Sequence, residues 1–179
     1  MGTDSLEPGD DDLVVRARTG SAAAMEQLYR RYRDRIMAFA WRMTGDRSLA
    51  EDIFQGTFIY FYEHLARYDA QGRLSAYLFK IARNQALDAL RSGRRRKRLL
   101  SRVDPAEPPA PDEPPSDLAG KALLELPPHL REVVTLKLYE GLDYARIGEI
   151  TGVPEATARS RMRYALDALR QALQQRKTP

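Results

Sequence analysis

The sequence predicts an all-α protein of two small helical domains joined by a flexible linker that is rich in proline and acidic residues. Apolar residues recur at three- and four-residue spacing through much of the chain, which is typical of amphipathic helices. Residues 99–117 interrupt that pattern with six prolines and five acidic side chains, and proline removes a backbone donor and fixes φ. No strand-like alternation of any length is seen. We therefore expect a disordered tail at 1–10, a first domain at 11–98, the linker at 99–117 and a second domain at 118–175.

Capping residues and glycines delimit the helices of the first domain. Ser21 is expected to cap a long helix that ends near Thr44. Ser48 and Glu51 match a capping box, in which each side chain satisfies a backbone donor of the other residue. The fourth helix is expected to end near Gly93. The four helices are expected at about 12–19, 22–44, 48–65 and 74–92, with a loop at 68–73 before the last.

The second domain is predicted to contain a helix-turn-helix. Asp143 is a suitable N-cap for a helix over Tyr144–Thr151, and Gly152 tolerates the left-handed geometry that often ends a helix. Pro154 suits the first turn of the next helix. Two earlier helices are expected, over about 118–126 and 129–139.

The last helix has an apolar stripe and an opposite, cationic face. The polar face carries Arg159, Ser160, Arg163 and Tyr164. A basic face on the second helix of such a pair is typical of a segment that enters a DNA groove. An ordinary helical hairpin with a solvated basic face is the alternative.

The charge distribution points to a polyanionic partner. The net charge is only +4, but residues 67–103 carry eleven basic and two acidic side chains. Arg94–Arg98 form a basic run, which attracts phosphate or is solvated and does not read sequence. We interpret the acidic cluster Asp10–Asp12 as solvated.

Residues for catalysis or metal binding are scarce. The chain has no cysteine, and its two histidines fall in different predicted domains. No phosphate-binding glycine loop is present. We expect no enzyme, no cofactor and no metal. No apolar run is long enough to cross a bilayer, and no signal sequence is seen, so we expect no membrane partner and a cytoplasmic location.

Aromatic and cationic residues gather around the loop at 68–73. Tyr68, Tyr77, Lys80 and Asn84 lie in or after it. Unpaired bases are bound by stacking on aromatic faces in a cationic groove, so the two tyrosines are candidates for nucleic-acid contact. The phenylalanines of the preceding helix, Phe54, Phe58 and Phe61, are interpreted as core residues because of their helical spacing.

Sequence blocks in three regions of the chain, in the family's order, resemble bacterial RNA polymerase sigma factors. AEDIFQGTF at 50–58 and YLFKIARNQALD at 77–88 resemble the region that binds polymerase and reads the minus-ten element. LPPHLREV at 126–133, EGLDY at 140–144 and TARSR at 157–161 resemble the domain that reads the minus-thirty-five element. Two such domains with a short linker are the layout of the extracytoplasmic function group.

The resemblance implies roles for individual residues. Asp52, Gln55 and Phe58 fall in the segment that in the family docks on the beta-prime clamp helices of core RNA polymerase. The loop at 68–75 matches one that captures an extruded base of the non-template strand. Roles in reading the opened minus-ten strand are implied for Tyr68, Tyr77, Lys80 and Asn84. Roles at the minus-thirty-five duplex are implied for Arg159, Ser160, Arg163 and Tyr164.

Two residues depart from the family pattern. Gly56 stands where the family usually has an acidic residue, and Tyr77 replaces the usual tryptophan but keeps an aromatic face.

Anti-sigma proteins commonly control this group, so an anti-sigma factor joins core polymerase and promoter DNA among the implied partners. The rival hypotheses are a conventional helix-turn-helix regulator that is not a polymerase subunit, and a nucleic-acid enzyme such as a recombinase.

Overall fold

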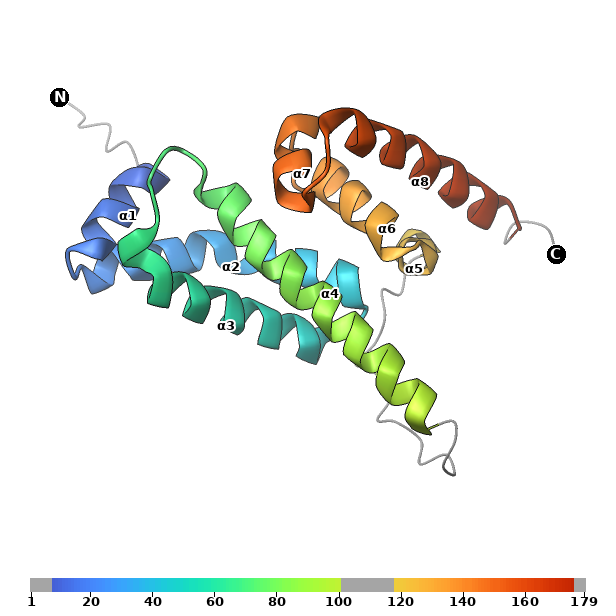
Figure 1. The fold of residues 1–179 in the computed structure, drawn as a ribbon, viewed down its shortest axis with the longest axis horizontal. Coiled ribbons are helices and arrows are strands. Elements are labelled where there is room, and N and C mark those ends of the chain that lie inside the picture. Colours follow the sequence, from blue (N-terminus) through green and yellow to red (C-terminus); the bar gives the residue numbers. More distant parts are fainter. Residues whose placement is uncertain (1–7, 101–117, 176–179) are drawn as a thin grey trace.

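The structure is a computed structural model that describes residues 8–100 and 118–175, and its ordered elements are helical (Figure 1). No strand occurs within those ranges, so the predicted all-α class is confirmed. The first helical group comprises α1 (Asp10–Arg18), α2 (Ala22–Thr44), α3 (Arg47–His64), the 3₁₀ turn η1 (Leu65–Arg67) and α4 (Leu74–Leu100). The second comprises α5 (Leu118–Glu125), α6 (Pro128–Val134), the π-helical turn η2 (Thr135–Tyr139), α7 (Tyr144–Thr151) and α8 (Glu155–Gln175).

Several helix boundaries lie where the local chemistry predicts them. Ser21 Oγ accepts the Ala24 N–H at 3.3 Å, and Gly45 ends α2 with φ of +74°. Asp143 Oδ1 accepts the Arg146 N–H at 2.7 Å at the start of α7. Gly152 ends α7 in the left-handed region, with φ of +71°, where a residue without Cβ avoids a steric penalty.

The predicted capping box at Ser48 is wrong. The N-cap of α3 is Asp46, whose side chain accepts the Leu49 N–H at 3.0 Å. Ser48 therefore already lies inside the helix, and Glu51 lies 3.6 Å from Arg47 on the same exposed face. Two candidate caps two residues apart compete, and the aspartate directly after the Gly45 turn begins the helix.

The predicted end of the fourth helix near Gly93 is also wrong. Helix α4 continues through Gly93 to Leu100, which includes the first two residues of the expected linker. The arginines, lysine and leucines that follow Gly93 are good helix formers, and no proline occurs between Gly93 and Pro105. Residues 101–117 of the linker and most of the expected tail, residues 1–7, lie outside the described residues.

Helices α2, α3 and α4 pack around an aromatic core. Phe39, Phe61 and Phe79 are fully buried, as is most of Tyr32. Phe54 and Phe58 are also buried and lie edge-on to the Tyr29 ring, with centroids 4.8 and 5.1 Å away. The expectation that the phenylalanines of α3 form core is confirmed.

The second group of helices packs around the helix-turn-helix. Ala158, Met162 and Ala165 face inward from α8, and Ile147 and Ile150 face them from α7. A Cβ at Gly148 would lie 2.7 Å from the carbonyl oxygen of Val153. This close approach of α7 to the turn requires glycine, because real Cβ atoms do not come so near a backbone oxygen.

The two helical groups pack against each other, with α7 beside α4 and α5 beside α2 (Figure 1). Arg131 of α6 is buried and donates to the carbonyl oxygen of Met43 in α2. The Arg35 guanidinium of α2 lies 3.0 Å from the Glu140 carboxylate, and the Arg42 guanidinium lies 3.8 Å from the Tyr139 ring centroid. Buried apolar side chains of both groups form one continuous cluster.

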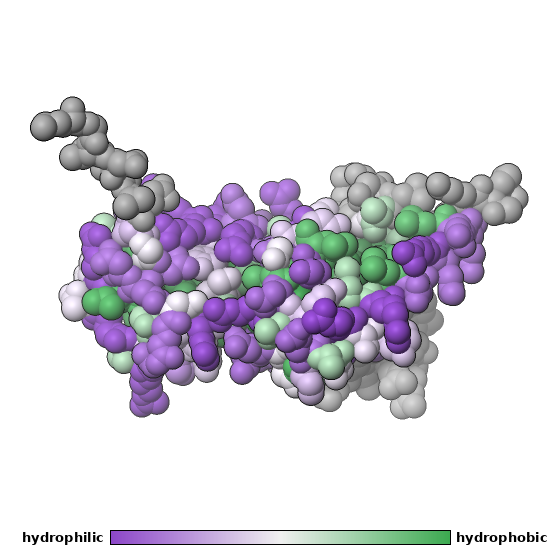
Figure 2. Space-filling model, turned by 90° about the horizontal axis from the view of Figure 1, so that it is seen from above, coloured by the Kyte–Doolittle hydropathy of each residue, from purple (hydrophilic) through white to green (hydrophobic). Residues whose placement is uncertain are grey.

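The surface is mostly hydrophilic on the face that Figure 2 shows, and the visible hydrophobic residues gather over the half that holds the second helical group. Within the described ranges no helix is both long and apolar enough to span a bilayer.

Candidate nucleic-acid interface

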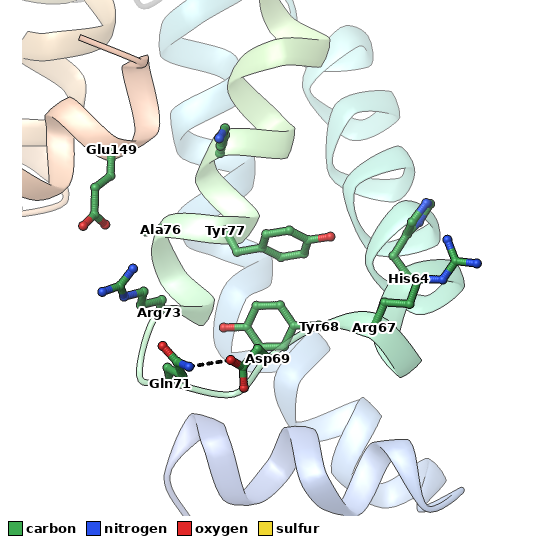
Figure 3. A pocket seen from close by; sticks show the side chains of 10 residues that line it. His64, Arg67, Tyr68, Asp69, Gln71, Arg73, Ala76, Tyr77 and Glu149 are labelled. Atoms are coloured by element: carbon green, nitrogen blue, oxygen red, sulfur yellow. Dashed lines mark hydrogen bonds between the residues drawn. The ribbon is translucent and has the colours of Figure 1, made fainter.

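An open pocket of about 590 Å³ lies between the end of α3, the following loop and the first turns of α4 (Figure 3). Its lining combines aromatic, cationic and amide side chains with two carboxylates, Asp69 and Glu149. These residues are His64, Arg67, Tyr68, Asp69, Gln71, Arg73, Ala76, Tyr77, Lys80 and Glu149.

Two tyrosine rings form the aromatic wall of this pocket. Tyr68 and Tyr77 have ring centroids 4.9 Å apart, and both rings lie roughly edge-on to Phe61 behind them. Tyr68 is only 8% exposed, whereas Tyr77 is partly exposed. An aromatic face that is held rigidly by its neighbours is suited to stacking against a planar base.

Burial raises the pKa of both tyrosines. The pKa of Tyr68 rises to about 12, first because the phenol is removed from water and then because the Asp11 carboxylate is near. Burial also raises the pKa of Tyr77. Both rings are therefore neutral at physiological pH and carry no charge that repels phosphate.

Cations frame the rim of the pocket. Arg67, Arg73 and Lys80 are exposed and come from η1, the loop and α4. Lys80 and Asn84 continue the Tyr77 face along α4 at three- and four-residue spacing. Asn84 is exposed and accepts from Arg83 at 3.2 Å, but it does not line the pocket. Three of the four candidate minus-ten residues are therefore brought together, with Asn84 one turn beyond.

Sequence reasoning missed part of this pocket. The sequence predicts the loop at 68–73 but no individual role for its residues Asp69 and Gln71. His64 and Arg67 precede the loop, and a basic and aromatic cluster in that segment was a usable signal. Glu149 belongs to α7, and no local pattern predicts that it lies beside a loop nearly eighty residues earlier in the chain.

The four predicted residues of the last helix are all exposed on α8. Arg159, Ser160, Arg163 and Tyr164 occupy the face opposite the buried Ala158, Met162 and Ala165. The Arg159 guanidinium lies 4.8 Å from the Tyr144 ring centroid and pairs with Glu155 one turn earlier. Arg161, which shares the TARSR block, instead turns inward to within 3.3 Å of Glu132.

Two of the three predicted polymerase-binding residues are exposed, and the third is not. Asp52 and Gln55 lie on the outer face of α3. Phe58 is only 7% exposed and packs against Phe54 and Phe61, so its side chain is a core residue and not a contact surface.

The outer face of α3 continues with apolar residues that the sequence did not single out. Ile59 is 58% and Tyr62 is 68% exposed. They extend the Asp52–Gln55 line at helical spacing, so one stripe runs along α3 with an acidic start and an apolar end. Large apolar residues exposed together mark an interaction surface.

Gly56 lies where α3 and α4 approach closely. A Cβ at this position would lie 2.7 Å from Oε1 of Gln85. The glycine that departs from the family pattern therefore leaves room for the Gln85 side chain to pack against α3.

No group of three or more potential metal ligands occurs in the described ranges 8–100 and 118–175.

Comparisons with known proteins show which family the chain resembles. Residues 28–96 match the family of sigma-70 region 2, and residues 116–169 match sigma-70, region 4. The chain is 36% identical over 165 residues to RNA polymerase sigma factor CarQ of Myxococcus xanthus, covering 89% of this chain and 95% of that protein. It is also 36% identical over 186 residues to ECF RNA polymerase sigma factor SigE of Mycolicibacterium smegmatis, covering 96% and 72%.

Solved structures share the fold. CnrH in complex with the cytosolic domain of CnrY superposes with a TM-score of 0.73 at 23% identity, covering 94% of this chain and 99% of that one. RpoE in complex with the anti-sigma factor NepR from Bartonella quintana gives 0.67 at 24% identity, covering 83% and 96%.

Proposed function

This chain belongs to the extracytoplasmic function group of RNA polymerase sigma factors, which direct promoter-specific transcription with core RNA polymerase, and we propose that it reads its promoter with the two surfaces described above. The pocket beside α4 takes the opened minus-ten strand, and the exposed face of α8 takes the minus-thirty-five duplex. The chain acts as a DNA-binding polymerase subunit and catalyses no reaction itself. It acts in the cytoplasm, where polymerase and DNA are present.

The pocket supports single-strand reading by its composition. Tyr77 offers a partly exposed aromatic face, and Tyr68 supports that face from below. Lys80 and Arg73 at the rim attract the backbone phosphates. A base that leaves the duplex loses stacking and pairing energy, and contacts in such a pocket offset that loss.

The α8 face supports duplex reading by its exposure. Arg159 and Arg163 are both long cations on a helix whose opposite face is buried, so the helix presents them to the major groove. Arginine forms bidentate hydrogen bonds to guanine or contacts phosphate. Ser160 and Tyr164 add hydroxyl groups between and beside these cations.

The stripe along α3 supports docking on polymerase. Asp52 and Gln55 supply the polar part of the contact, and Ile59 and Tyr62 supply an apolar part of the kind that carries much of the binding energy at protein interfaces. We propose that this stripe meets the clamp helices of core polymerase.

An anti-sigma factor is a further proposed partner. The solved complex of RpoE contains the anti-sigma factor NepR, and that of CnrH contains the cytosolic domain of CnrY. A protein that covers the α3 stripe, or that holds the two helical groups together, would keep this chain from polymerase and promoter.

One observation carries the proposal: Tyr68, Tyr77 and Lys80 line a single pocket. Run-off transcription with core polymerase on a genomic fragment library tests it and identifies the promoters used. We expect discrete start sites that need this protein, together with permanganate-reactive thymines near the minus-ten position. A conventional regulator would bind duplex DNA alone and produce neither signal, and that result would overturn the proposal.

A further inference from the structure

We propose that helix α1 positions the loop that receives the extruded base, with Asp11 and Arg18 holding its two ends. The inference rests on the proposed minus-ten function of that loop. It assigns a role to a helix that precedes the matched region 2 segment, which begins at residue 28, and to acidic residues that the sequence suggested were solvated.

Asp11 and Arg18 reach the two ends of the loop directly. Asp11 Oδ2 accepts the backbone N–H of Gly72 at 2.7 Å. The Arg18 guanidinium donates to the backbone carbonyl oxygen of Tyr68. The two residues are seven positions apart, which is two helical turns, and so project from one face of α1 with the fully buried Val14 between them.

The first domain holds α1 firmly enough to act as a support. Leu13 and Val14 are fully buried. The Asp10 carboxylate lies 2.7 Å from the Arg31 guanidinium and accepts from the Tyr32 hydroxyl, both on α2. Asp10 therefore ties the start of α1 to α2, and Asp11 extends from that fixed point to the loop.

The loop depends on contacts from outside for its shape. Tyr68 at the start of the loop is buried and Ala70 is partly buried. Asp69, Gln71, Gly72 and Arg73 are all exposed, so the second half of the loop has little apolar burial of its own. Gly72 adopts a left-handed φ of +66°, a conformation that most residues avoid. The Asp11 carboxylate holds the amide of this residue, and its charge strengthens the hydrogen bond.

The same helix borders Tyr68, the tyrosine that supports the stacking ring of Tyr77. The Asp11 carboxylate is close enough to the Tyr68 phenol to contribute to its raised pKa. Moving α1 or deleting the Asp11 carboxylate would therefore alter the loop backbone and the support of the Tyr77 ring together. The expected defect is a loss of base discrimination at one promoter position and not a loss of polymerase binding.

Matched pairs of variants on α1 test the proposal. Asp11→Ala and Arg18→Ala remove the two loop contacts. Asp12→Ala and Arg16→Ala remove a neighbouring exposed pair, 3.5 Å apart, that does not touch the loop. Each control changes the charge of α1 by the same amount as its partner. Asp11→Asn keeps an acceptor oxygen and is included so that a folding defect of the alanine variant does not decide the result.

The first readout needs neither polymerase nor DNA. Amide hydrogen exchange of Gly72 is measured in the full-length free protein. We expect exchange about tenfold faster or more in Asp11→Ala, an intermediate rate in Asp11→Asn, and the wild-type rate in Asp12→Ala, because only Asp11 protects this amide. Equal rates in Asp11→Ala and Asp12→Ala would overturn the assigned contact.

The second readout measures base discrimination in the holoenzyme. The probe is the non-template single strand of a promoter found by run-off transcription, either intact or with one abasic site at each minus-ten position. We expect wild type to bind the intact strand much more tightly than the strand lacking the captured base. Asp11→Ala and Arg18→Ala should reduce that ratio about tenfold, while Asp12→Ala and Arg16→Ala should leave it unchanged.

The outcomes separate the two levels of the proposal. If no abasic site weakens binding by the wild-type protein, base capture itself is wrong, whatever the exchange rates show. A different result overturns only the inference about α1. In that result, one abasic site weakens binding by the wild-type protein, but the Asp11 and Arg18 variants discriminate as well as their controls.

Discussion

Arg83 of α4 and Glu132 of α6 form a buried ion pair across the two helical groups. Arg83 Nε lies 2.7 Å from Glu132 Oε2, and the carboxylate is fully buried. Arg161 of α8 lies 3.3 Å from the other oxygen of the same carboxylate. One acidic side chain thus binds a cation from the helix beside the proposed minus-ten pocket and another from the helix that carries the proposed minus-thirty-five face.

Replacing Arg83 with methionine should loosen the packing of the two groups. The variant keeps an apolar stem but removes the interdomain donor, while Arg161 still pairs with Glu132. A hydrogen bond between charged groups contributes on the order of 2 kcal/mol, so we expect a larger radius of gyration by small-angle X-ray scattering. Arg91→Met is the control, because Arg91 is exposed and pairs with Asp88 on the same helix. Equal radii for the two variants would mean that other contacts, such as α7 on α4, hold the closed arrangement.

Alanine at Gly148 should destabilise the helix-turn-helix. The added Cβ would lie 2.7 Å from the Val153 carbonyl oxygen, which belongs to backbone and moves only with the turn. We expect a loss of about 2–3 kcal/mol in the free energy of urea unfolding. Gly56→Ala is the matched control, because its close neighbour is the flexible end of Gln85. In Gly56→Ala the helix-propensity gain of about 1 kcal/mol offsets the cost of displacing the Gln85 side chain. A large loss of unfolding free energy in this control would contradict the reasoning.

Arg163→Ala should weaken binding of the holoenzyme to its minus-thirty-five duplex. If Arg163 reads a base, the loss is about 1–3 kcal/mol and confined to the cognate sequence. An equal loss on all sequences, with a shallower dependence of affinity on salt, would assign the side chain to phosphate. Arg170→Ala serves for comparison, since Arg170 lies further along α8, is exposed and pairs with Asp167. It should leave the affinity near wild type.

Tyr62→Ala should weaken binding to core polymerase. Tyr62 is 68% exposed on the outer face of α3 and makes up the apolar end of the proposed docking stripe. Removal of such an aromatic anchor reduces affinity by about 2 kcal/mol, measurable by competition with a labelled sigma factor. Val15→Ala removes an exposed apolar residue of α1 away from the stripe. A similar loss for both variants would show that the α3 stripe has no special role.

Tyr68→Phe should reduce the loss of stability at alkaline pH. The pKa of Tyr68 is raised from 10 to about 12 in the folded protein, so folding favours the neutral phenol. That contribution is fully present below pH 10 and is lost as the pH rises through 12. Between pH 8 and 11.5 the variant should lose about 2 kcal/mol less unfolding free energy than wild type. A parallel decline in both proteins would show that Tyr68 titrates normally. Tyr29→Phe, at an exposed ring, is the control.

Sequence patterns predicted those features that depend on a few neighbouring residues. Asp143 and Gly152 delimit α7 as expected, because caps act on backbone groups within one turn. The exposed face of α8 followed from helical periodicity alone. The capping box at Ser48 failed because Asp46 lies two residues earlier and offers the same chemistry. The end expected at Gly93 failed because the residues after it favour helix.

Burial on α3 shows where periodicity is insufficient. Phe58 and Ile59 are adjacent and both apolar, and only the packing of α3 against α2 and α4 decided that Phe58 is core and Ile59 is exposed. The family resemblance assigned Phe58 to the polymerase surface, whereas the stripe that this chain presents continues through Ile59 and Tyr62.

The sequence by itself determined the helices, the helix-turn-helix and the family, because each rests on local spacing, capping and block order. Tertiary structure alone decided that Asp11 reaches Gly72, that Glu149 borders the pocket beside α4 and that Glu132 pairs with Arg83. Residues in these pairs lie about fifty to eighty positions apart, and their distances depend on how whole helices pack. No pattern within one helix encodes that packing, so the loop support and the interdomain ion pair appear only in the folded chain.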